Sequence, residues 1–172
     1  MIGSAPPAQR AFSGKKEKNM EMPKPSAGHR RLEMLAGSWE GKETMYPSQW
    51  DPKGGIAVGR TTSRLAVGGF ALISDYEQER DGAISFSGHG VYTFDPKTEL
   101  YSLFWLDSTG SPPEVFGGAF TDDVLTLSHG GPPMHVCLTW DLTKSGRIAS
   151  KMEMSDDGVT WNKLFDAEYR RT

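Results

Sequence analysis

The chain has a single cysteine, Cys137, so an intrachain disulfide is excluded, and its apolar neighbours predict a buried, unreactive thiol. Its 19 lysines and arginines are outnumbered by 22 aspartates and glutamates, and the net charge of −3 argues against a nucleic-acid-binding surface. No apolar run approaches the ~20 residues needed to cross a membrane, and the N-terminus lacks the apolar segment of a signal peptide. We therefore expect a cytoplasmic protein with neither nucleic-acid nor membrane partners.

Recognised catalytic and phosphate-binding signatures are also missing. The sequence contains no Gly-rich phosphate loop, Walker motif, Rossmann fingerprint or nucleophile elbow. His129 and His135 flank Gly130-Gly-Pro-Pro133, and this spacing matches no established set of metal ligands, so we expect no metal site. The 20 glycines and 11 prolines that are present are typical of many short strands joined by tight turns.

The chain divides into an extension and one domain. Residues 1–28 are rich in proline and lysine and contain little to bury, so they predict a disordered extension, whereas residues 29–172 suit a single domain with a sizeable core. Ser26 is a candidate N-cap of a short helix that ends near Leu35. We expect this helix to turn its leucines towards the core and to close one end of the domain.

The stretch from Leu35 to Pro47 predicts the first strand. Gly37 permits a sharp entry, Trp39 can plug the closed end of a barrel, and alternation places Glu43 on the Trp39 face. Asp81-Gly82 is a two-residue hairpin signal between two of the strands that follow. Together the segments predict an all-β, antiparallel up-and-down barrel of about ten strands, which leaves no exposed edge. The remaining strands are expected at residues 56–65, 70–80, 84–94, 101–107, 115–120, 124–128, 134–141, 148–154 and 160–169.

Strand parity selects the side chains for the interior. Most strands have one face rich in aromatic residues, including Tyr76, Tyr92 and Trp105. Glu43 would be either desolvated or paired with an arginine of the next strand, where Arg60 and Arg64 share one parity. Such a pair could bind an acidic ligand or simply hold the barrel together.

The histidine between Gly88 and Gly90 allows two readings. His89 could be an acid/base or a ligand contact, because the glycines let another group approach closely, or it could bond to a neighbouring strand.

A barrel of about ten strands has more interior than its side chains fill, so we expect a ligand cavity. The first hypothesis is a binding protein for a small apolar or amphipathic molecule. The second is a cofactor-independent hydrolase, isomerase or cyclase acting on a small hydrophobic substrate, and a structural or self-associating domain, compatible with a homodimer, is the third. The predicted lining is Trp39, Glu43, Arg60, Tyr76, His89, Tyr92 and Trp105. The candidate acid/base groups of the enzyme are Glu43, His89 and Asp107.

Several segments resemble known families. The Gly37-Ser-Trp motif is similar to that of the calycin group, which includes lipocalins and fatty-acid-binding proteins, and the run to Pro47 resembles the first strand of nitrobindin-like barrels. Residues 32 to about 170 resemble a bacterial family, DUF1579, a domain of unknown function. The resemblance implies a calycin-like barrel and leaves its function open. The segments that carry it are Leu35–Trp39, Gly59–Tyr76, Gly88–Asp95 and Trp105–Gly110.

The nitrobindin resemblance raises the question of haem. Proteins of that family ligate haem through a histidine on a late strand, and Lys151–Arg171 contains no histidine. Glu43 and Met45 also occupy places where the family has glycines that make room for the porphyrin. We therefore expect no haem and no other cofactor.

Overall fold

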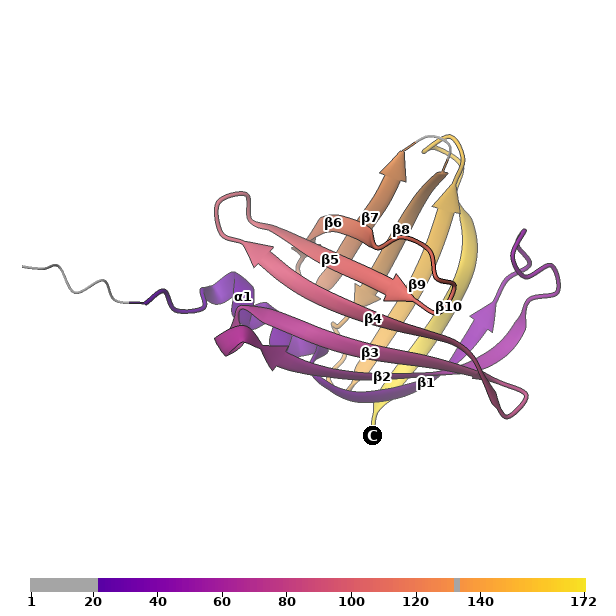
Figure 1. Cartoon of the computed structure of the whole chain (residues 1–172), viewed down its shortest axis with the longest axis horizontal. Coiled ribbons are helices and arrows are strands. Elements are labelled where there is room, and N and C mark those ends of the chain that lie inside the picture. The colour runs from indigo at the N-terminus through magenta and orange to yellow at the C-terminus, as the bar shows by residue number, and fades with distance from the viewer. Residues whose placement is uncertain (1–21, 132–133) are drawn as a thin grey trace, which may run out of the picture.

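The computed structural model describes residues 22–131 and 134–172. Within these residues, ten antiparallel strands close a barrel in which each strand pairs with its neighbours in sequence and β1 pairs with β10 (Figure 1). The prediction of an all-β, ten-stranded, up-and-down barrel is confirmed. The strands are β1 (Gly37–Met45), β2 (Gly55–Ala66), β3 (Ala71–Arg80), β4 (Ala83–Asp95), β5 (Leu100–Asp107), β6 (Glu114–Thr121), β7 (Val124–Gly131), β8 (Met134–Asp141), β9 (Arg147–Ser155) and β10 (Asn162–Arg171).

The predicted strand bounds agree closely with these, and the main difference is at β7. This strand runs through His129 to Gly131 instead of ending at Ser128, because His129 and Gly131 pair with Val136 and Met134 of β8. The turn between β3 and β4 is the expected two-residue hairpin, since Asp81 and Gly82 both have positive φ, at 52° and 79°.

A short helical segment closes one end of the barrel. Helix α1 (Ala27–Arg31) begins after its N-cap Ser26, as predicted, and continues into the 3₁₀ turn η1 (Leu32–Leu35), and Figure 1 shows α1 beside one end of the strands. Leu32 is completely buried, and the Leu35 carbonyl accepts a hydrogen bond from the Trp39 indole Nε1 at 3.0 Å. Trp39 therefore plugs the closed end as expected. Residues 1–21 of the predicted extension lie outside the described residues.

Leucines form the tightest part of the core near this closed end. Leu72, Leu103, Leu125 and Leu127 are each at most 1% exposed and belong to one cluster with Leu32. Burying each such side chain contributes about 1.5–3 kcal/mol, so this end supplies much of the apolar driving force. The opposite end is not filled in this way.

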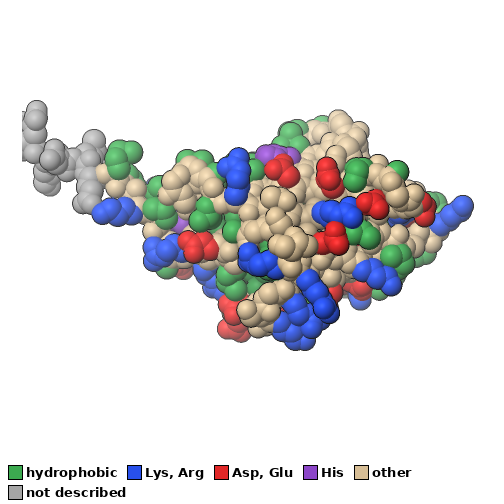
Figure 2. Space-filling model, turned by 90° about the horizontal axis from the view of Figure 1, so that it is seen from below, with side chains coloured by type: hydrophobic (Ala, Val, Ile, Leu, Met, Phe, Trp, Pro, Cys, Tyr) green, Lys and Arg blue, Asp and Glu red, His purple; other side chains and the backbone are tan. Residues whose placement is uncertain are grey.

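The outer surface mixes both signs of charge. Figure 2 shows Lys and Arg side chains interspersed with Asp and Glu over the face that it presents. None of the helices among the described residues is long and apolar enough to span a membrane.

Candidate functional site

The barrel encloses a cavity of about 630 Å³ that reaches from Leu35 and Trp39 to the loop at Trp50. Because a water molecule takes about 30 Å³ in the liquid, this volume equals roughly twenty waters, which is within the range of small-molecule sites. Its two sides differ. The polar wall consists of Thr61, Ser63, Ser74, Tyr76, Gln78 and Tyr169, from β2, β3 and β10. The apolar wall consists of Phe86, Tyr92, Leu103, Trp105, Phe116, Val136, Leu138, Trp140, Ile148 and Met152, from β4, β5, β6, β8 and β9.

A buried carboxylate organises the polar wall. Glu43 of β1 is completely buried, and its carboxylate accepts hydrogen bonds from Tyr76 at 2.8 and 2.9 Å, from Gln78 Nε2 at 2.7 Å, and from the Tyr169 hydroxyl. Three neutral donors therefore satisfy the carboxylate, and none of the arginines among the described residues takes part. The Glu43 side chain lies behind these donors and does not itself line the cavity, so its prediction as a lining residue is wrong.

Two paired glycines make room for this arrangement. Gly41 of β1 lies opposite Gly59 of β2 in the ladder. A Cβ at Gly59 would overlap the Glu43 carboxylate and lie 2.6 Å from its Cδ, and a Cβ at Gly41 would lie 2.7 Å from Cδ1 of Tyr169. The wall is thus recessed where the carboxylate and the Tyr169 ring pack against it.

Both tyrosines keep their protons over the physiological pH range. Burial, followed by the nearby charge of Glu43, raises the pKa of Tyr76 far above its usual value, and the same two causes raise the pKa of Tyr169. Each hydroxyl therefore donates its hydrogen to Glu43 and presents only lone pairs to other partners.

The apolar wall is built around Trp105. A Cβ at Gly90 would lie 3.3 Å from the indole, and one at Gly88 would overlap it, so these two glycines let the ring lie flat on β4. The Trp105 Nε1 donates to Asp107 at 3.1 Å, and the ring centroid lies 6.3 Å from that of Tyr76. Tyr92 and Trp140 pack edge to face further inside, at 5.9 Å. Trp39, Tyr76, Tyr92 and Trp105 line the cavity as the sequence predicted, and Asp107, a candidate acid/base group, also lines it.

Charged side chains surround the open end. Arg80 donates to Asp51 at 2.7 Å, and this hydrogen bond holds the pKa of Asp51 below its usual value. Asp107 and Glu114 also line the cavity, whereas Trp50 is 59% exposed and lies at its mouth. The charged lining residues of the described chain are thus three carboxylates and one guanidinium.

Two predicted lining residues face outwards. Arg60 is paired across the strands with Glu40 on the outer wall, and its guanidinium bonds to Glu40 at 2.7 Å and to Glu79 at 2.8 Å. His89 lies on the outer face of β4, where its Nδ1 is 2.7 Å from Asp75 of the neighbouring strand. The predicted cavity contacts of Arg60 and His89, and an acid/base role for His89 in the cavity, are therefore wrong, because the barrel wall separates both side chains from the ligand space.

Of the two alternatives predicted for Glu43, the pairing with an arginine is wrong, because Arg64, like Arg60, has the outward parity of β2. Cys137 is likewise half-buried rather than buried, and burial raises the pKa of its thiol.

Sequence reasoning did not select Gln78, Arg80, Asp51 or Tyr169. Gln78 and Arg80 have the parity of Tyr76, which is a signal that could have identified them. Tyr169 could have been found from barrel closure, which places the last strand beside the first. Asp51 lies in a loop between β1 and β2, where no periodicity applies.

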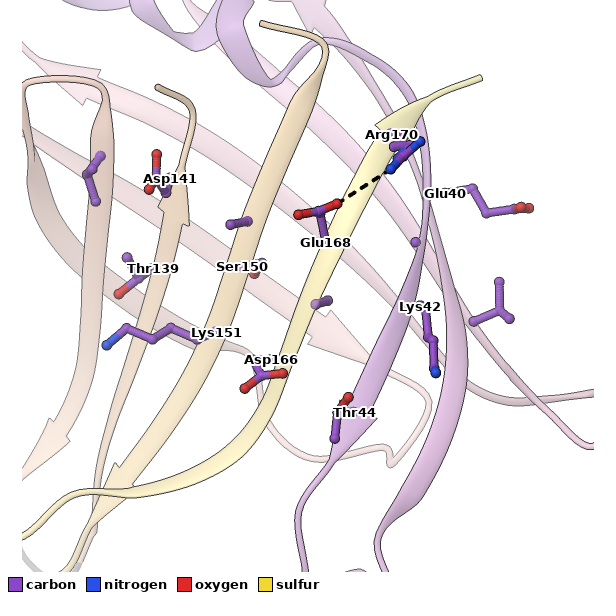
Figure 3. A pocket seen from close by; sticks show the side chains of 15 residues that line it. Glu40, Lys42, Thr44, Thr139, Asp141, Ser150, Lys151, Asp166, Glu168 and Arg170 are labelled. Carbon is purple, nitrogen blue, oxygen red and sulfur yellow. Dashed lines mark ion pairs between the residues drawn. The ribbon is translucent and has the colours of Figure 1, made fainter. Parts of the chain in front are cut away.

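A second hollow, of about 950 Å³, lies on the outer wall over β8, β9, β10 and β1 (Figure 3). Its side chains carry both signs, and they are largely paired with one another or with neighbours. Glu168 bonds to Arg147 and lies 3.9 Å from Arg170, and Lys151 lies 2.7 Å from Glu153. This groove selects no ligand by charge, so the interior cavity is the candidate site. Within the described ranges, no cluster of three or more His, Cys, Asp or Glu side chains could hold a metal ion.

Comparisons with known proteins agree with this fold. No curated protein shows significant sequence similarity to the chain. The crystal structure of Rv2717c from M. tuberculosis is similar with a TM-score of 0.59 and 17% identity, over 86% of this chain and 98% of that one, which shows a shared fold. A family model described as "Protein of unknown function (DUF1579)" matches residues 24–171. Since this match includes the helical segment and all ten strands, the chain belongs to the DUF1579 family.

Proposed function

We propose that the barrel binds a small, largely apolar or amphipathic molecule in its interior cavity. The observation that carries this proposal is the unfilled space of about 630 Å³ between one aromatic wall and one polar wall. A barrel that served only as a structural unit would gain stability by filling this space, because larger inward side chains would add packing contacts.

The composition of the lining supports the same proposal. Small-molecule sites are mostly apolar, with a few polar groups that fix orientation. Here the Trp105, Tyr92 and Trp140 rings supply apolar area, and the Tyr76 and Tyr169 hydroxyls supply fixed polar contacts. The exposed Trp50 at the mouth would cover the outer end of a bound molecule.

The enzymatic alternative receives less support. His89 lies outside the barrel and Glu43 is enclosed by its donors, so of the three candidate acid/base groups only Asp107 borders the space a substrate would occupy.

Tryptophan fluorescence tests the proposal directly. Four of the five tryptophans line the cavity, so Nile red or decanol, both uncharged, should bind saturably and change the emission. Val136→Trp, which fills the cavity from β8, should abolish binding, whereas Thr139→Trp, on the outer face of the same strand, should not. The proposal would be contradicted if the protein bound neither probe and Val136→Trp raised its stability.

A further inference from the structure

We propose that the cavity selects ligands whose polar end is a hydrogen-bond-donating cation, such as a primary ammonium on an apolar chain, and rejects carboxylates. This inference rests on the proposed binding function and specifies the chemistry of its ligand. Three independent observations support it: the direction of the hydrogen bonds on the polar wall, the charge of the lining, and the aromatic rings beside the tyrosine hydroxyls.

The hydrogen bonds of the polar wall leave lone pairs on two residues that line the cavity. Tyr76 and Tyr169 both give their hydroxyl hydrogen to Glu43, and Tyr76 also accepts from Gln78 Nε2 at 3.2 Å. Ser85 donates to the Gln78 Oε1 at 3.3 Å. One lone pair of Tyr76 and both lone pairs of Tyr169 thus remain for a ligand. A ligand can satisfy them only by donating a hydrogen bond.

Among the described residues, no opposite charge is paired with the Glu43 carboxylate next to these hydroxyls. Glu43 is completely buried, and its partners Tyr76, Gln78 and Tyr169 are all neutral. A buried charge without an opposite charge is expensive, because neutral donors replace its lost hydration only in part. A cation resting on the two hydroxyls would be attracted by Glu43, whereas an anion there would be repelled.

The other charged residues of the lining also favour a positively charged ligand. The charged side chains of the lining are three carboxylates, Asp51, Asp107 and Glu114, and one guanidinium, that of Arg80, which is already paired with Asp51. A cleft with a net negative lining concentrates cations at its mouth. The rings of Trp105 and Phe86 lie beside Tyr76, with centroids 6.3 and 6.0 Å from that of the tyrosine ring. An ammonium group over the face of such a ring is attracted to it.

Arg80 provides the competing outcome. Its guanidinium borders the cavity, so a ligand carboxylate could bind beside it at the mouth, with its chain pointing inwards. The two orientations predict opposite preferences for the charge of the ligand, and one comparison therefore separates them.

Decylamine, decanol and decanoate share one chain and differ only in the polar end, so titrating each at pH 7 below its aggregation concentration isolates that end. Because hydrogen bonds to charged groups are roughly twice as strong as neutral ones, we expect decylamine to bind roughly tenfold or more tightly than decanol, and decanoate to bind most weakly. Decanoate binding as tightly as decylamine would overturn the inference. Equal binding of all three would overturn it too while leaving the proposed function standing, whereas no binding of decanol or Nile red would remove the proposed function itself.

Substitutions test which residues cause the preference for decylamine over decanol. Glu43→Gln should reduce the preference for decylamine over decanol to a few-fold at most, and Glu40→Gln, on the same strand but facing outwards, should leave it unchanged. If Glu43→Gln does not fold, Tyr76→Phe provides the second test, because it removes one acceptor and retains the ring. An undiminished preference in the variant that folds would show that the polar wall does not make the selection.

Discussion

Replacing Gly59 by alanine tests whether the recess in the barrel wall is what seats the Glu43 carboxylate. The backbone of Gly59 has no positive φ, so alanine fits the strand itself and the whole effect comes from the added methyl. That methyl would overlap the carboxylate and lie 3.0 Å from Cε1 of Tyr169. The carboxylate must then move away from some of its donors.

The magnitude follows from the bonds that must be given up. A hydrogen bond to a charged group contributes about 1.5–3 kcal/mol, and overpacking a core by one methyl costs about 1–3 kcal/mol. These two costs describe one displacement and do not add in full, so we expect Gly59→Ala to lower the free energy of unfolding by about 2–4 kcal/mol. For a chain of 172 residues, this corresponds to a fall in Tm of roughly 5–15 °C.

Urea and thermal unfolding, followed by circular dichroism, measure this change. Gly117→Ala is the matched control, since it lies in β6 and a Cβ there meets nothing within 4 Å. Its stability should equal or slightly exceed that of the wild type. In a Glu43→Ala background the methyl of Gly59→Ala has room, and its cost should fall by at least about 1 kcal/mol. If Gly59→Ala is as stable as Gly117→Ala, the carboxylate is free to move and the account of the polar wall is wrong.

Three further predictions follow from the placement of other side chains. Arg60→Ala and His89→Ala should leave Nile red binding unchanged, because both side chains face outwards; weaker binding in titrations would contradict this placement. Gly88→Ala should push Trp105 into the cavity and weaken Nile red binding, with Gly117→Ala as the control. Unaltered affinity would show that the indole need not lie on Gly88. Backbone N–H groups hold the pKa of Asp157 well below its usual value. The Tm of the wild type should therefore exceed that of Asp157→Ala by its full amount above about pH 4, and the difference should shrink as the pH falls. A difference in Tm that does not change with pH would rule out this contribution.

Strand alternation was sufficient to predict most of the fold and part of the site. The aromatic residues Tyr92 and Trp105 mark the inner faces of their strands, and Trp39 does the same for β1, so parity alone placed them correctly. Parity also gave His89 the face opposite to Tyr92, which is the outer face that the structure shows. Its selection as a ligand contact came from the neighbouring glycines, whose actual role is to accommodate Trp105.

Strand β2 shows why parity was not sufficient. Its outer face carries Ile56 and Val58, and its inner face carries Ala57 and Gly59, so apolar character points to the wrong side. The inner side chains are small because the Glu43 carboxylate fills the space in front of them, and that carboxylate comes from another strand. The sequence of β2 alone cannot reveal a contact with a side chain of another strand. The charge of the cavity lining depends on the same contact. If Arg60 pointed inwards, it would neutralise Glu43, and the wall would suit an acidic ligand. Because Arg60 points outwards, Glu43 has only neutral donors and the lining has an excess of carboxylates. In this proposal, the orientation of strand β2 therefore determines which charge a ligand can carry.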